Sequence, residues 1–153
     1  MRSFIRIFKV VILSLFISSC AAGLLPLPEK YSLDGQLEPV TKIYKYGLIE
    51  WEKVDQQSLI LRTGPSDYYL LVLMIPAYEL PFTDIIRLSS TGTMIRAGMD
   101  EVILSAPGDI NVRYIIERIY RIKGNKQMLE IKKQLMTKDD KKDVTVRQKD
   151  KGI

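Results

Sequence analysis

Apolar runs of strand length, separated by turn residues, fill the middle of this 153-residue chain. Glycine, proline and aspartate stand between the runs, and their backbone preferences favour turns. The runs lie at residues 49–52, 59–61, 68–75, 85–88, 93–96, 101–104 and 112–122. This pattern predicts an all-β domain over residues 38–123, a small antiparallel sandwich or barrel of about six to seven short strands.

Three of these runs are informative about burial. Ile49 and Trp51 alternate with Glu50 and Glu52, which predicts a strand with one face in water. Residues 68–75 are continuously apolar, as in a central strand covered on both faces. Residues 112–122 also fit a helical stripe, but four isoleucines and a valine favour a strand because their side chains are stiff at χ1. We therefore expect a strand there.

The segment before the predicted domain, residues 20–37, has no sustained apolar period. Pro26, Pro28 and Gly35 stand among scattered leucines. Such a composition predicts a tether between the N-terminus and the domain, some of whose leucines can still pack on it.

The C-terminal segment, residues 124–153, has a different character. Met128, Ile131 and Leu135 recur at helical spacing after Asn125, which predicts a short amphipathic helix with Asn125 as its N-cap. Beyond Met136 the chain is rich in Lys and Asp. We expect a disordered charged tail there, because such a segment buries too little apolar area to offset its ordering entropy.

Residues 1–19 have the order of a secretory signal peptide. Three basic residues precede the apolar run 10–17, and two serines follow it. The run is too short to span a bilayer comfortably, so an uncleaved membrane anchor is the less favoured interpretation.

The stretch Ile17-Ser18-Ser19-Cys20 resembles a bacterial lipobox. The resemblance implies lipidation of the Cys20 sulfur, cleavage before Cys20 and acylation of the freed amine. A terminus with two or more acyl chains is stably anchored to a membrane. Because Ala21 stands where aspartate would favour inner-membrane retention, the resemblance implies the periplasmic face of the outer membrane of a Gram-negative bacterium. The alternative is a cysteine that occurs in an apolar leader by chance.

Charge is divided unevenly along the chain. The formal net charge of +5 is the sum of +3 in residues 1–19, −3 in residues 21–122 and +5 in residues 123–153. A mildly acidic body argues against a nucleic-acid surface. The basic tail could dock on anionic lipid, but four aspartates are interleaved with its basic residues, and a solvated tail is the simpler interpretation.

Composition excludes several kinds of chemistry. The chain has no histidine, and Cys20 is its single cysteine. Structural zinc sites and Ser-His-Asp triads are therefore excluded, as is an internal disulfide. We expect no cofactor and no metal.

The remaining candidate site residues also have plain structural interpretations. Trp51 could stack on a ligand, but a tryptophan on an alternating strand is more often core. The tyrosines at 44, 46, 68 and 69 are expected to be half-buried strand residues. Five acids could supply a catalytic carboxylate pair or a calcium site: Asp55, Asp67, Asp84, Asp100 and Glu101. All five lie near predicted turns, where carboxylates usually accept backbone N–H groups or face water.

The body resembles a family of small, uncharacterised Gram-negative envelope lipoproteins that is catalogued as a domain of unknown function. The resembling pieces are Trp51 with Asp55, Tyr69-Leu70-Leu71, Pro76-Ala77-Tyr78-Glu79-Leu80, Asp84-Ile85-Ile86-Arg87-Leu88, Gly98-Met99-Asp100-Glu101-Val102 and Ile116-Glu117-Arg118-Ile119. In that family a cysteine often stands at the positions of Ala77 and Tyr114. The resemblance implies that this chain lacks both and is held together by packing. It supplies no reaction.

These observations favour a lipid-anchored, non-catalytic module that binds or scaffolds another envelope component, with an envelope protein as a possible partner and no nucleic acid. A small periplasmic hydrolase that uses paired Asp and Glu carboxylates is the alternative. A purely structural lipoprotein is the third hypothesis. A buried carboxylate pair in an open pocket would favour the hydrolase, whereas an exposed apolar patch would favour binding.

Overall fold

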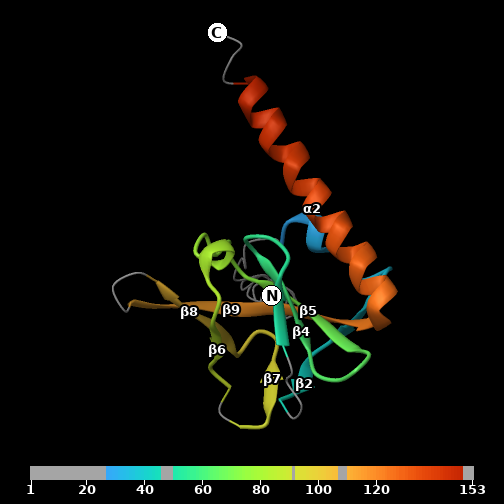
Figure 1. Ribbon diagram of the computed structural model, residues 1–153, viewed down its shortest axis with the longest axis vertical. Helices are drawn as coiled ribbons and strands as arrows, with labels where there is room; N and C mark the ends of the chain where they lie inside the picture. Colours follow the sequence, from blue (N-terminus) through green and yellow to red (C-terminus); the bar gives the residue numbers. More distant parts are fainter. Residues whose placement is uncertain (1–26, 46–49, 91, 107–109, 150–153) are drawn as a thin grey trace, which may run out of the picture.

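The computed structural model describes residues 27–45, 50–90, 92–106 and 110–149, with side chains described up to Thr137 at the C-terminal end. The predicted signal peptide, Cys20 and Tyr46 lie outside these residues. The described chain is mostly β-structure with one C-terminal α-helix (Figure 1). The all-β prediction is therefore confirmed.

Nine strands are present in the described residues, two more than the seven apolar runs of the sequence. They are β1 (Glu38–Val40), β2 (Lys42–Tyr44), β3 (Glu50–Lys53), β4 (Ser58–Arg62), β5 (Asp67–Leu73), β6 (Ile86–Leu88), β7 (Met94–Arg96), β8 (Glu101–Ala106) and β9 (Ile110–Lys123). Two 3-10 turns, η1 (Glu29–Tyr31) and η2 (Leu80–Phe82), and the helix α2 (Gly124–Lys149) complete the fold. The additional strands, β1 and β2, have three residues each and show no alternation long enough to predict them.

Seven strands form one antiparallel sheet that curls into a half-barrel (Figure 1). Its order is β3-β4-β5-β9-β8-β6, and β1 also pairs with β9. The long strand β9 organises this sheet, because one edge pairs with β5 while the other pairs with β8 and then with β1. Strands β2 and β7 form a separate two-stranded ribbon. The run at residues 112–122 is thus a strand, as predicted.

Both faces of the sheet are covered, and the alternating residues of β5 show how. Leu71 and Leu73 lie in a cluster that we call the ribbon-side core. Leu70 and Val72 lie in a second cluster, the helix-side core. All four side chains are fully buried. The apolar run therefore marks a central strand, as the sequence predicted, but the strand ends at Leu73, two residues before the end of the run.

The segment that we expected to be a tether contributes to the helix-side core. Tyr31, Leu33 and Leu37 are buried there beside Ile131 and Leu135 of α2. The packed body therefore begins near η1 and not at residue 38. The apolar residues of this segment follow no regular period, so only the sheet face that receives them identifies them as core.

Helix α2 differs from the short helix that the sequence predicted. It begins at Gly124, one residue before Asn125, which is therefore not the N-cap. Instead, the side chain of Gln127 accepts a hydrogen bond from the backbone N–H of Lys123 at 2.6 Å. The helix then continues to Lys149 through the segment that we expected to be a disordered tail. No glycine or proline interrupts residues 125–150, which permits this length.

Candidate functional site

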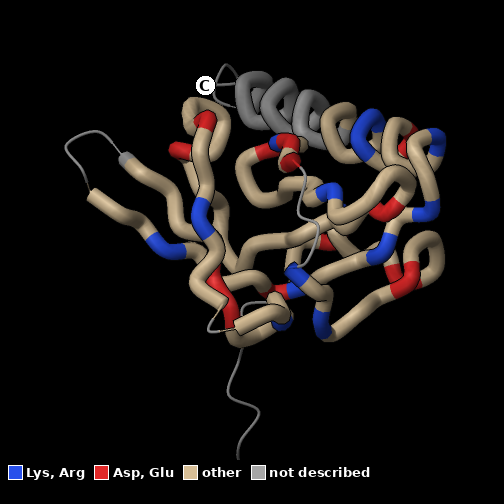
Figure 2. Tube along the Cα trace, turned by 60° about the horizontal axis from the view of Figure 1, so that its bottom comes forward, with Lys and Arg blue, Asp and Glu red and all other residues tan. Residues whose placement is uncertain are grey.

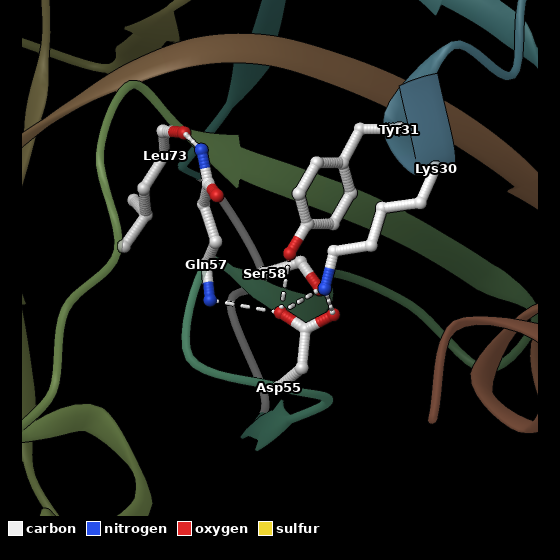
Figure 3. A network of polar contacts seen from close by, with 6 residues as sticks. All are labelled: Lys30, Tyr31, Asp55, Gln57, Ser58 and Leu73. Carbon is white, nitrogen blue, oxygen red and sulfur yellow. Dashed lines mark hydrogen bonds and ion pairs between the residues drawn. The ribbon is translucent and has the colours of Figure 1, made fainter. Parts of the chain in front are cut away.

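The carboxylate of Asp55, one of the five candidate acids, lies at the centre of a polar network (Figure 3). Its Oδ1 accepts hydrogen bonds from Tyr31 Oη at 2.8 Å, from Ser58 Oγ at 2.9 Å and from the backbone N–H of Gln57 at 2.8 Å. Its Oδ2 pairs with Lys30 Nζ at 3.2 Å, and the Asp55 side chain is only 3% exposed. Because four donors already occupy the carboxylate, it has a structural role.

The Asp55 network fixes the turn between β3 and β4 to two other parts of the chain. Lys30 and Tyr31 bring η1 to the turn (Figure 3). On the other side, Gln57 Nε2 donates to the carbonyl oxygen of Leu73 at 2.9 Å, and the Leu73 N–H donates back to the Gln57 carbonyl at 2.8 Å. The turn therefore joins the start of the packed body to the end of β5.

The other four candidate acids do not form a cluster with Asp55. Asp67 pairs with Arg121 at 3.5 Å, and Glu101 pairs with Arg113 at 3.0 Å. Asp100 Oδ2 accepts the backbone N–H of Arg96 at 2.7 Å. Asp84 is exposed. Within the described residues, no group of three or more acids or cysteines could hold a metal ion.

The aromatic candidates are distributed between core and surface. Trp51 and Tyr69 are partly buried against the ribbon-side core, and Tyr68 is buried in the helix-side core. Tyr44 is 57% exposed, more than we expected for a half-buried strand residue. The short β2–β7 ribbon explains this exposure, because Ile43 and Ile95 face the core while their neighbours face water.

Several exposed apolar side chains, which no sequence pattern predicted, lie on the connection from β5 to β6. We call residues 74–85 the apolar loop. Its exposed side chains are Ile75 at 46%, Tyr78 at 67%, Phe82 at 88% and Ile85 at 72%. Four large apolar side chains are thus exposed within eleven residues, and exposed apolar surface concentrated in this way is typical of interaction sites.

The base of the apolar loop is firmly held, although its outer side chains are exposed. Ala77 and Leu80 are fully buried in the ribbon-side core. The backbone N–H of Ala77 donates to the Gln56 carbonyl at 2.7 Å, and Thr83 Oγ1 donates to the Glu79 carbonyl at 2.9 Å. These contacts fix the backbone that carries the exposed side chains.

Tyr114 of β9 provides a further link to the apolar loop. Its Oη donates a hydrogen bond to Glu79 Oε2 at 2.5 Å. Burial, together with the hydrogen bond and charge of Glu79, raises the pKa of Tyr114 from 10.0 to about 12. The positions at which the family resemblance implies cysteines, 77 and 114, both lie in the ribbon-side core. In this chain a tyrosine–glutamate hydrogen bond joins the same loop to the same strand.

Charged residues of both signs are interspersed over the described body (Figure 2). Several form exposed ion pairs between neighbouring elements, such as Arg62 with Glu50 and Lys132 with Glu52. A surface of mixed sign is unlike the basic stripe that binds phosphate backbones. No helix among the described residues is long and apolar enough to cross a membrane.

Comparisons with known proteins identify a family but no activity. A model described as a family of unknown function (DUF6491) matches residues 3–139. No curated protein and no solved structure matches the chain. Since the matched residues make up most of the sequence, the chain belongs to this family of unknown function.

Proposed function

We propose that this protein is a non-catalytic lipoprotein of the periplasmic face of the outer membrane in a Gram-negative bacterium. Lipid on Cys20 anchors it, and the body binds or scaffolds another envelope component. The observation that carries the binding role is the apolar loop, with four exposed apolar side chains on a firmly held base. Exposed apolar surface of this kind is retained where a partner covers it.

The arrangement of the acids supports a binding role over the alternative hydrolase. Glycosidic cleavage needs two carboxylates that face a common space. Asp55 is occupied by four donors, and Glu101 pairs with an arginine on the neighbouring strand. Neither carboxylate is therefore available as half of such a pair without breaking a structural contact.

The anchor is supported by the lipobox-like sequence before Cys20 and by the lone cysteine that lipidation explains. The family match over residues 3–139 also includes the proposed leader. Replacing Cys20 with Ser removes the thiol that forms the thioether. We expect the variant to lose both fatty-acid labelling in cells and cleavage of the leader. Continued labelling of Cys20→Ser would contradict the anchor.

The binding role is tested by placing a photo-crosslinking residue at position 82 in intact envelopes. Position 44 serves as the control, because Tyr44 is also exposed but lies on the β2–β7 ribbon. We expect a crosslinked product, with either a protein or a lipid of the envelope, from position 82 and none from position 44. Equal crosslinking from both positions, or none from either, would contradict a specific role of the apolar loop.

A further inference from the structure

The apolar loop lies next to the place where the N-terminal segment joins the body. Both contact the β3–β4 turn, residues 54–57. Lys30 and Tyr31 of η1 bind Asp55 of this turn, and the backbone N–H of Ala77 donates to the carbonyl of Gln56, the next residue. Lys53, just before the turn, also donates to the Pro81 carbonyl. The chain that leads back to Cys20 therefore enters the body beside the apolar loop.

The distance from Cys20 to the body is limited by the chain itself. Eight residues, 21–28, separate Cys20 from the first residue of η1. Fully extended, they reach at most about 30 Å. Lipid on Cys20 would therefore hold this side of the body close to the bilayer. Because the link is short, the bilayer is present at a high effective concentration beside the apolar loop.

We infer that the apolar loop is a second membrane contact, at which Tyr78 and Phe82 enter the headgroup region of the bilayer that holds the Cys20 lipid. Ile75 and Ile85 flank them and add apolar area. The body then rests on the membrane at two adjacent points, the lipid and the loop. This inference rests on the proposed lipid anchor and names the surface that the apolar loop binds.

The chemistry of the loop fits a lipid interface. Tyrosine and tryptophan are enriched at the boundary between headgroups and acyl chains, and phenylalanine is common on the apolar face of segments that bind there. Backbone N–H groups are costly in that environment unless they are hydrogen-bonded. Pro76 and Pro81 have no N–H, and the amides of Ala77, Leu80 and Phe82 already donate to carbonyl groups of the protein. The loop can therefore approach lipid without exposing these groups to it.

Charge around the loop is compatible with the same surface. Lys53 is exposed and is bonded to the Pro81 carbonyl, which places a cation at the base of the loop. Asp84 is exposed between Phe82 and Ile85, so the loop suits the hydrated headgroup layer and not the hydrocarbon interior. Because buried Ala77 and Leu80 already fix the loop, binding has little ordering cost.

Helix α2 offers another possible contact, because it extends beyond the side of the body on which η1 and η2 also lie (Figure 1). Its C-terminal part could meet the same membrane. The experiment therefore includes a variant without residues 138–153. If the apolar loop makes the contact, removal of these residues leaves the contact in place.

Tryptophan fluorescence can report the contact directly, because Trp51 is the only tryptophan. In a Trp51→Phe background, one tryptophan is introduced by Phe82→Trp or, as the matched control, by Tyr44→Trp. Each full-length gene is expressed, and the mature protein is purified and reconstituted into phosphatidylethanolamine/phosphatidylglycerol vesicles. The acyl chains carry bromine near the carbonyl end. Circular dichroism establishes that each variant is folded, and the mass of the N-terminal peptide establishes lipid on Cys20.

We expect the brominated lipid to quench most of the fluorescence at position 82 and little at position 44, with the same result after removal of residues 138–153. Equal quenching at both positions, or no quenching at position 82, would overturn the loop contact while the lipid anchor stands. Quenching that disappears with residues 138–153 would assign the contact to α2. A crosslink from position 82 to a protein in envelopes, without quenching, would assign the loop to a protein partner. A protein without lipid on Cys20 would overturn the anchor and this inference together.

Discussion

The Asp55 network offers the sharpest test of how the N-terminal segment is held. Asp55→Ala removes an acceptor that four donors share, from Lys30, Tyr31, Gln57 and Ser58. Tyr31 and Ser58 are fully buried, so their hydroxyl groups lose a partner that water cannot easily replace. Each buried hydrogen bond that loses its acceptor costs about 1–3 kcal/mol.

Since these losses share one acceptor and are not fully additive, we expect Asp55→Ala to lower the free energy of unfolding by about 3–5 kcal/mol, the loss of two to three hydrogen bonds to a buried charged acceptor. Asp55→Asn keeps one acceptor oxygen but replaces the oxygen beside Lys30 with an amide nitrogen, which cannot accept its hydrogen bond. We expect it to cost about 1–3 kcal/mol. For a domain of this size, 1 kcal/mol corresponds to about 4–8 °C in the thermal midpoint. Denaturant and thermal unfolding, followed by circular dichroism, measure both variants.

Asp34 provides the matched control. It also ties the N-terminal segment to the sheet, through Arg118 at 2.9 Å, but both side chains of this pair are at least 40% exposed. An exposed pair contributes about 0–1 kcal/mol, so Asp34→Asn should leave the midpoint almost unchanged. If Asp55→Ala shifts the midpoint no more than Asp34→Asn does, the buried network does not hold the segment, and the reasoning fails.

Three further perturbations follow from the fold. Leu71→Asp places an unpaired charge in the ribbon-side core and should abolish cooperative unfolding. Glu50→Ala on the exposed face should lower the free energy of unfolding by less than about 0.5 kcal/mol. A folded Leu71→Asp protein would contradict the placement of β5. Because the pKa of Tyr114 is raised from 10.0 to about 12, the unfolded chain loses this proton first as pH rises. Stability should fall between pH 10 and 12 by up to about 2–3 kcal/mol, and denaturant titrations of Tyr114→Phe should show a shallower fall; an equal slope would refute the assignment. Removal of residues 138–153 should shift the thermal midpoint by less than about 5 °C, because the described packing of α2 ends at Leu135; a larger shift would show that the distal helix packs on the body.

The sequence by itself determined the class of the fold and its central strands. The continuous apolar run at residues 68–75 predicted a strand with cover on both faces, and β5 has that cover in the two cores, although it ends at Leu73 and Ile75 is exposed. The β-branched residues of 112–122 favoured a strand over a helix, and β9 is that strand. The chemistry that composition excludes, with no histidine and one cysteine, also follows from the sequence alone.

Only the tertiary structure decided which irregular segments belong to the body. Tyr31, Leu33 and Leu37 follow no helical or strand period, so their burial depends on a sheet face formed by residues far along the chain. The length of α2 was missed for the opposite reason. The segment after Met136 has little apolar area to bury, which predicted disorder. It also contains no glycine or proline before Gly152, so its backbone can continue the helix.

The candidate site was likewise decided in three dimensions. Residues 74–85 contain six large apolar side chains in addition to two prolines, and nothing in their order separates buried Leu80 from exposed Phe82. That separation arises because hydrogen bonds to the β3–β4 turn and to Tyr114 fix one side of the loop against the ribbon-side core. Asp55 was similarly one of five equivalent acids in the sequence. Long-range contacts with η1, which the local pattern does not encode, give it a structural role.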